Sequence, residues 1–212
     1  MSPLSWINFA DMNSAEMKQV MNQASRYFET RTEDKNVEPS HHLENKAHST
    51  NTAQQEKINE RSQSLRDLFF NKQILFCRED SRAAHVLYIL AAFANLLCQQ
   101  PDLINNLVFI IICSSQVPSH ELEAVPEIVR QINQLYGTTG FVPVHFYHQE
   151  IDQDELLAFM NAAHIGLCLT ESSVQEFSHQ TGHPRKSVFV PEPSNIPRLT
   201  EALQNAFMNL VK

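Results

Sequence analysis

The sequence predicts an α/β fold in which helices cover both faces of a doubly wound parallel sheet. Short runs that are apolar at nearly every position are typical of strands buried on both faces. Segments with helical spacing separate these runs, which is the pattern of parallel strands joined by helical crossovers. Helix-ending residues support the boundaries, because Pro101 and Gly137 each follow a helical segment.

The predicted elements follow one another from residue 58 onward. Strands are expected at residues 73–77, 107–113, 141–147, 165–169 and 187–190. Helices are expected at residues 58–69, 83–98, 119–135, 152–162 and 196–211. These elements form one domain, assigned to residues 57–212. Because ligands of such sheets bind beyond the carboxyl ends of the strands, we expect the site in residues 78–84, 114–118, 145–149 and 170–176.

The chain ahead of this domain, residues 1–56, is expected to form an N-terminal extension. Residues 30–56 contain few apolar side chains, so burial would not offset the entropy of ordering them, and we predict disorder. Residues 14–28 place Met17, Met21 and Ala24 on one helical face, which predicts an amphipathic helix. The sequence leaves open whether this helix docks on the domain or on another protein.

Glycine is scarce, with 4 residues in a chain of 212, where average usage would give about 15. Neither G-x-G-x-x-G nor G-x-x-x-x-G-K-[ST] occurs, which argues against a dinucleotide fingerprint and a P-loop. The nucleophile motif G-x-S-x-G of serine hydrolases is also absent. The net charge of −8 argues against nucleic acid or an anionic membrane as a partner.

Targeting signals are not expected in this sequence. The first residues have no basic region and no long apolar core, so we expect no signal peptide. The longest apolar run, residues 107–113, is far shorter than the roughly 20 residues of a membrane helix. Cysteines stand at positions 77, 98, 113 and 168 without a C-x-x-C motif, which favours buried, reduced thiols in a cytoplasmic protein.

Two arginines after the first strand are candidates for binding phosphate. Arg78 and Arg82 precede a predicted helix, whose N-terminus attracts anions. The alternative is that Arg78 pairs with Glu79 or Asp80. The residues alone favour this second interpretation.

Other candidate groups are weaker. His179 and His183 have the spacing of a helical metal pair, but Gly182 and Pro184 disfavour a helix there and no third ligand has suitable spacing, so we expect no metal. Glu171 follows a predicted strand, where a catalytic acid could stand, but one acidic residue is slight evidence. No cofactor is expected.

The centre of the chain contains two neighbouring motifs. Residues 128–138 read IVRQINQLYGT, and residues 141–148 read FVPVHFYH. These stretches resemble the trehalose-6-phosphate synthase family, which has I-V-G-R-I-N-G-x-F-G-T followed by F-V-P-I-H-F-x-H. Residues 154–169, DELLAFMNAAHIGLCL, match its D-E-L-x-A-L-Y-x-x-S-D-V-C-L-V. Weaker matches flank this stretch, and the resemblance covers roughly residues 57–212.

This resemblance implies half of a GT-B glycosyltransferase fold. Family enzymes work in a cleft between two Rossmann-like domains, of which the C-terminal one binds UDP-glucose and the N-terminal one supplies most of the glucose-6-phosphate site. The present chain resembles the donor-side domain. Residues 1–56 are too few and too polar to form the acceptor-side domain.

Several donor-site positions depart from the family pattern. Arg78 matches the arginine that neutralises the leaving diphosphate, whereas the lysine of the same loop falls on Ala83 or Ala84. The Asp-Gly pair of the second motif is Ser173-Val174, and the short interval from 177 to 187 suggests that about one βα unit is missing.

His145 and Phe146 remain from the segment that lies beside uracil in the family. The resemblance therefore implies that any retained UDP site would use Arg78, His145 and Phe146.

Three functions remain open from the sequence. The leading hypothesis is a catalytically inactive relative that binds subunits of a trehalose synthase complex. One alternative is a glucosyltransferase from UDP-glucose to glucose-6-phosphate, or a fragment of one that another chain completes. The other alternative is a sensor that binds UDP, UDP-glucose or a sugar phosphate without turnover.

Overall fold

A computed structural model describes residues 52–181 and 187–210 of the 212-residue chain. Strands are β1 (Gln73–Glu79), β2 (Leu107–Cys113), β3 (Val144–His148), β4 (Ile165–Cys168) and β5 (Ser187–Phe189). Helices are α2 (Thr52–Leu68), α3 (Ala83–Gln99), α4 (Val125–Tyr136), α5 (Gln153–Ala162), α6 (Glu171–Thr181) and α7 (Ile196–Leu210). Short 3-10 turns are η2 (Pro101–Leu103) and η3 (Ser119–Glu121).

The strands form one sheet in the order β3-β2-β1-β4-β5, and every pair is parallel. The chain first builds outward from β1 to β3 and then crosses back to the other side of β1. The strand order therefore reverses between β1 and β4, and such a reversal point is where doubly wound sheets bind ligands. The predicted fold class is confirmed.

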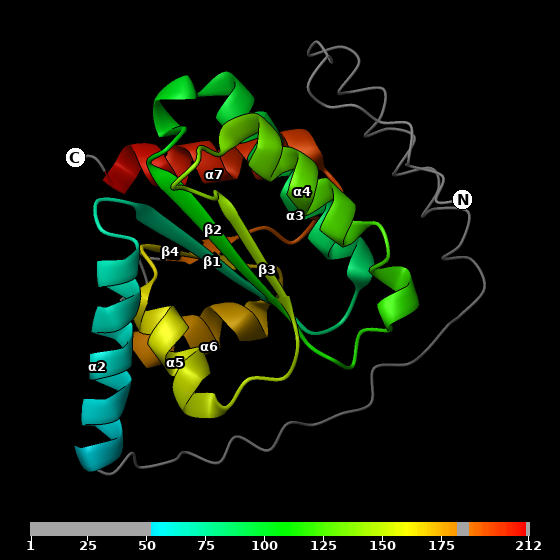
Figure 1. Cartoon of the computed structure of the whole chain (residues 1–212). Coiled ribbons are helices and arrows are strands. Elements are labelled where there is room, and N and C mark those ends of the chain that lie inside the picture. The colour runs from blue at the N-terminus through cyan, green and yellow to red at the C-terminus, as the bar shows by residue number, and fades with distance from the viewer. Residues whose placement is uncertain (1–51, 182–186, 211–212) are drawn as a thin grey trace.

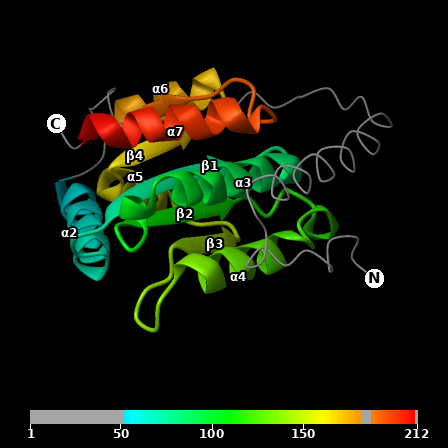
Figure 2. The same cartoon turned by 90° about the horizontal axis from the view of Figure 1, so that it is seen from above.

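Helices cover both faces of the sheet (Figure 1). Helices α3, α4 and α7 lie side by side on one face, named the α3 face, as the view from above shows (Figure 2). Helices α2, α5 and α6 lie on the other, named the α5 face. Each face has its own apolar core: Leu75 and Phe109 belong to the first, Phe76 and Ile110 to the second. The alternation within β1 and β2 explains why their sequences are apolar throughout.

Two strand boundaries differ from the prediction by two residues or more. Strand β1 continues through Arg78 and Glu79, because both residues pair with β2. Strand β3 begins at Val144 rather than at Phe141, which instead bridges Thr138 in a turn. Proline at position 143 has no N–H to donate to a ladder, which explains why the strand begins after it.

Helix α6 was not predicted, and it corrects the expectation that a helix around His179 is disfavoured. It occupies Glu171–Thr181 and includes His179, while Gly182 and His183 lie outside the described residues. Its single buried residue, Phe177, packs into the core of the α5 face. A parallel connection between β4 and β5 needs such a crossover. The polar sequence of α6 shows no apolar helical pattern, so packing against the sheet stabilises this helix.

Helix α2 also begins earlier than expected. Residues 52–56, predicted to belong to a disordered linker, form its first turn. Gln54 donates a hydrogen bond of 2.6 Å to Asp154 of α5, so contact with α5 stabilises this turn. The predicted helix at residues 14–28 and the rest of the predicted linker, residues 30–51, lie outside the described residues.

Candidate functional site

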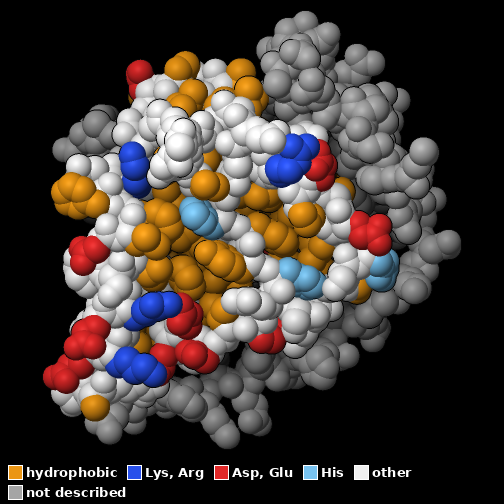
Figure 3. Space-filling model, viewed as in Figure 1, with side chains coloured by type: hydrophobic (Ala, Val, Ile, Leu, Met, Phe, Trp, Pro, Cys, Tyr) orange, Lys and Arg blue, Asp and Glu red, His pale blue; other side chains and the backbone are white. Residues whose placement is uncertain are grey.

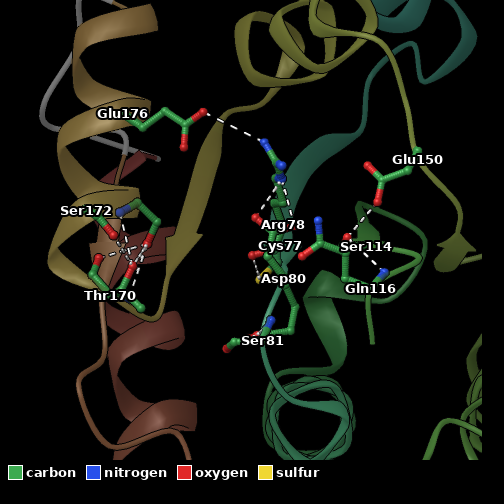
Figure 4. Close-up of polar contacts among 12 residues, drawn as sticks. Cys77, Arg78, Asp80, Ser81, Ser114, Gln116, Glu150, Thr170, Ser172 and Glu176 are labelled. Atoms are coloured by element: carbon green, nitrogen blue, oxygen red, sulfur yellow. Dashed lines mark hydrogen bonds and ion pairs between the residues drawn. The ribbon is translucent and has the colours of Figure 1, made fainter. Parts of the chain in front are cut away.

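The candidate site lies at the carboxyl ends of β1, β2 and β4, where the strand order reverses (Figure 4). The segment after β1 leads into α3 on one face, and the segment after β4 leads into α6 on the other. Between them the structure gathers polar side chains from residues far apart in the sequence. The residues that define this crevice are Arg78, Glu79, Asp80, Ser114, Glu150, Thr170 and Glu176.

Glu79 is a buried carboxylate, with an exposed fraction of 3%. Its Oε1 accepts hydrogen bonds from the backbone N–H groups of Ser81 (2.8 Å) and Arg82 (3.0 Å) and from the Ser81 hydroxyl (2.6 Å). Its Oε2 lies 2.9 Å from Nδ1 of His85, in the first turn of α3. Glu79 therefore places a negative charge at the N-terminus of α3, the position that attracts anionic ligands in α/β proteins.

The electrostatics of this carboxylate are balanced by its partners. Burial by itself would raise the pKa of Glu79, but the hydrogen bonds from His85 and Ser81 outweigh burial and lower that pKa below its ordinary value. Glu79 is therefore ionised at neutral pH.

Arg78 is held by carboxylates rather than left open to the crevice. Its Nε lies 2.9 Å from Asp80, and its Nη1 lies 3.8 Å from Glu176 of α6. Of the sequence alternatives, pairing with an adjacent acid is the one found, although the partner is Asp80 and not Glu79. Arg82, the other candidate, is the N-cap residue of α3, where its backbone N–H rather than its side chain bonds Glu79.

The segment after β4 satisfies its own polar groups. Thr170 Oγ1 accepts a hydrogen bond of 3.1 Å from the Ser173 N–H, and the Ser173 hydroxyl donates to the Thr170 carbonyl at 2.8 Å. These reciprocal bonds cap the start of α6 with neutral hydroxyl groups. Val174, which the resemblance aligns with a glycine of the family, packs its side chain against the core of the α5 face.

The segment after β2 is tied to the segment after β3. Glu150 accepts hydrogen bonds from the hydroxyl groups of Ser114 (2.7 Å) and Ser115 (2.8 Å). These bonds lower the pKa of Glu150, and Arg78 adds a smaller effect in the same direction. The crevice thus holds Glu79, Asp80, Glu150 and Glu176 beside Arg78, so carboxylates outnumber cations among the residues that define it.

Neither of the two positions predicted for the family's lysine carries a cation. Ala83 is buried at 1% exposure in the core of the α3 face, and Ala84 is half-buried. Neither side chain can carry positive charge. Glu171, named above as a possible acid, lies exposed at the start of α6, and the structure places no hydrogen-bond partner beside it within the described residues that would tune it for catalysis.

The three residues predicted to hold UDP are not gathered at one place. His145 pairs in register with Ile110, whereas Arg78 pairs with Ile112, the partner of Tyr147. His145 therefore stands two residues back from the level of Arg78, towards the start of β3.

His145 and Phe146 also point to opposite faces of the sheet. His145 contacts Phe69 on the α5 face, with ring centroids 5.2 Å apart, and burial lowers the pKa of its imidazole. Phe146 packs against the core of the α3 face. A shared UDP site for these residues stays a prediction from the family pattern.

The thiols and possible metal sites add little chemistry. Cys77, Cys113 and Cys168 are buried, as expected, whereas Cys98 is exposed. Burial raises the pKa of Cys113 to about 12 and that of Cys168 to about 11, so these thiols are unreactive at neutral pH. In the part of the chain that the structure describes, no three His, Cys, Asp or Glu side chains group as metal ligands do.

Sequence reasoning missed the roles of Glu79, Glu150 and Glu176. Glu79 was considered only as a partner of Arg78, although it stands four positions before Ala83, the first residue of α3, near a helix end that favours negative charge. The other two become site residues only through the packing of α6 and the β3–α5 connection, and no local pattern reveals that.

Comparison with known proteins identifies relatives for most of the chain. The model of glycosyltransferase family 20 matches residues 15–175. A trehalose-phosphatase of Schizosaccharomyces pombe is 32% identical over 109 residues, which are 49% of this chain and 13% of that protein. An α,α-trehalose-phosphate synthase of Yarrowia lipolytica is 32% identical over 92 residues, which are 40% of this chain and 19% of that protein. The chain thus spans less than a fifth of the length of these relatives.

Solved structures share the fold. The N-terminal domain of trehalose-6-phosphate phosphatase from Candida albicans superposes with a TM-score of 0.62 and 22% identity, over 71% of this chain and 37% of that one. An Escherichia coli protein bound with UDP-2-fluoro glucose superposes with a TM-score of 0.60 and 16% identity, over 72% of this chain and 42% of that one.

In the ranges 52–181 and 187–210, no helix has the length and apolarity that crossing a bilayer requires. The central motifs, the reversal of strand order beside β1 and the family match over residues 15–175 lead to one conclusion. The chain belongs to glycosyltransferase family 20, and its five-stranded domain is a GT-B half-domain like those of trehalose-phosphate synthases and phosphatases.

Proposed function

We propose that this chain is a trehalose-6-phosphate-synthase-like protein that does not transfer glucose by itself and acts as an interaction or regulatory subunit in trehalose biosynthesis. The relatives that support the pathway are synthases and phosphatases of trehalose phosphate. Each of them is much longer than this chain.

The observation that carries the proposal is the placement of carboxylates in the crevice. Glu79 already accepts hydrogen bonds from the N–H groups of Ser81 and Arg82, directly before α3, and Asp80 and Glu176 already pair with Arg78. A diphosphate entering here would have to displace these carboxylates from their partners. Two negative charges about 4 Å apart near a protein surface repel by roughly 4 kcal/mol, so competition of this kind is severe.

Catalysis would suffer further from the missing lysine. Transfer from a nucleotide sugar leaves charge on the diphosphate, and positively charged side chains stabilise that charge in the transition state. Ala83 and Ala84 cannot supply such a group. Loss of one such electrostatic contact commonly lowers kcat by about 10²–10³.

A turnover assay with UDP-glucose and glucose-6-phosphate tests the absence of catalysis. We expect no trehalose 6-phosphate above the level produced by the Arg78→Ala variant, which serves as the matched control. Turnover by the unaltered chain that the variant lacks would refute this part of the proposal and favour the glucosyltransferase.

A second experiment tests the subunit role. The chain, isolated from its native source under mild conditions, is expected to bring with it a protein that converts UDP-glucose and glucose-6-phosphate. Isolation as a lone monomer without such activity would contradict a role in a synthase complex.

A further inference from the structure

A groove of about 530 Å³ lies on the α5 face between α2, β3 and α5, and it meets the crevice at Glu150. Figure 3 shows apolar side chains gathered in a hollow on this side of the molecule. The apolar lining comes from the last turns of α2, the middle of the sheet and α5: Leu65, Leu68, Phe69, Ile112, Tyr147 and Phe159. On the α5 face, helices α5 and α6 do not extend over the side of the sheet that β3 forms (Figure 1).

The groove exposes side chains that a folded domain normally covers. Leu68 is 71% exposed, and Tyr147 is 38% exposed although it lies on a strand. Contiguous exposed apolar surface bordered by polar groups marks an interaction site. The polar border here is acidic, because Glu150, Asp152 and Glu155 line the groove and Arg61 is its one cation among the described residues.

The sequence contains a segment that matches this surface. In a helix spanning residues 14–28, Met17, Val20, Met21 and Ala24 would share one apolar face, and Tyr27 and Phe28 would extend it. The segment carries Lys18 and Arg26 against one acid, Glu16, so its charge is opposite to that of the groove border. Apolar face and charge are thus both complementary to the groove.

The tether between the segment and the groove has a suitable length. Residues 29–51 join the segment to α2, and a flexible chain of this length has an end-to-end distance of roughly 25–30 Å. The groove residues of α2, from Arg61 to Leu68, lie about 14–24 Å along the helix from Thr52. A tether whose length matches this span gives the segment an effective concentration at the groove in the millimolar range, so even weak contacts would keep the segment bound.

The family match gives an independent reason to join the segment to this domain. It begins at residue 15 and continues through the sheet to residue 175. The segment therefore belongs to the matched pattern and is not an unrelated extension.

We propose that residues 14–28 dock as an amphipathic helix in the groove between α2, β3 and α5 of the same chain. Met17, Met21 and Ala24 face Leu68 and Tyr147, and Lys18 lies near the acidic border. This contact does not depend on whether the chain transfers glucose. It completes the cover of the α5 face with a part of the chain that precedes α2.

Limited digestion of the full chain with trypsin tests the proposal. Lys18 and Arg26 lie in the segment, whereas Lys35 and Lys46 lie in the tether and serve as internal references. We expect cleavage at the segment to be about tenfold slower than at the tether, since only the undocked state is cut. Equal rates at both places would overturn the proposal.

Matched variants identify the surface involved. Leu68→Asp is expected to abolish the protection, whereas Met208→Asp, on α7 at a similarly exposed position (59%), is expected to leave it intact. On the segment, Met21→Glu is expected to abolish protection and the neighbouring Asn22→Glu to leave it intact. Protection that survives both Leu68→Asp and Met21→Glu contradicts the proposed contact.

Dilution separates this contact from contact between two copies. Docking within one chain predicts protection that is independent of protein concentration over at least about a hundredfold range. Protection that disappears on dilution, together with a dimer in light scattering, would assign the groove to a second copy and overturn the intramolecular proposal.

Discussion

The N-termini of α3 and α6 border the same crevice but are satisfied in different ways. At α3 a buried, ionised side chain, Glu79, accepts hydrogen bonds from the N–H groups of Ser81 and Arg82, which directly precede the helix. At α6 exposed neutral hydroxyl groups of Thr170 and Ser173 accept and donate within one turn. The first arrangement closes an anion-binding position with a built-in charge, whereas the second leaves a neutral, solvent-exposed cap. An anionic ligand would therefore have to displace a buried charged side chain at α3, whereas at α6 it would meet only exposed neutral hydroxyl groups.

The largest expected effect comes from removing the buried charge. Glu79→Ala leaves His85 and the N–H groups of Ser81 and Arg82 without their acceptor, and breaking a buried network of this kind costs about 3–5 kcal/mol. Urea unfolding measures the loss. The control, Asp80→Ala, removes an exposed partner of Arg78 and is expected to cost no more than about 1 kcal/mol. Equal losses would contradict the structural role assigned to Glu79.

The next effect concerns the packing that holds α6 against the sheet. A Cβ at Gly166 of β4 would lie 2.4 Å from Cε2 of Phe177, the residue that anchors α6. Because this ring is buried, Gly166→Ala is expected to destabilise the chain by about 1–3 kcal/mol. Gly140→Ala is the matched control, since its added Cβ would have no neighbour within 4 Å. Thermal unfolding of the two variants distinguishes them.

A smaller effect is expected from pH, again at α3. The pKa of Glu79 is lowered in the folded chain, so its contribution to stability is present above the unfolded pKa of about 4.3. That contribution is lost as the pH falls through the lower folded value. Unfolding free energies measured from pH 6 to pH 3 are expected to fall less steeply in Glu79→Gln than in the unaltered chain. Identical slopes would show that Glu79 is not stabilised as an anion.

The smallest effect is expected at the neutral cap of α6. Thr170→Ala removes the hydroxyl that accepts the Ser173 N–H, and loss of such a cap costs about 1 kcal/mol. Thr170→Ser keeps the hydroxyl and is expected to retain most of the stability. A loss at Thr170 as large as that at Glu79 would remove the contrast between the two helix ends.

The strands were predictable because a strand that is buried on both faces, such as β2, consists of consecutive apolar residues. Helix α6 was not, since its sequence is polar and only Phe177 is buried. The start of β3 was placed too early because the apolar run continues across Pro143, which lacks the ladder donor.

The place of Arg78 at the end of β1 follows directly from a motif, whereas its role at a site stays a prediction. The partners of Arg78 on α6 and the burial of Glu79 arise from tertiary packing, which no local pattern contains. That His145 and Phe146 face opposite sides of the sheet, in contrast, follows from the alternation of adjacent residues in the predicted strand.

The central claim is that carboxylates now occupy the positions where a donor diphosphate would bind. Calorimetric titration of the full chain with UDP tests it most directly, with Glu79→Gln and Glu176→Gln as variants that lower the negative charge of the crevice. The account predicts no binding heat at millimolar UDP for the unaltered chain. Binding of UDP by the unaltered chain, weakened by Arg78→Ala, would contradict it.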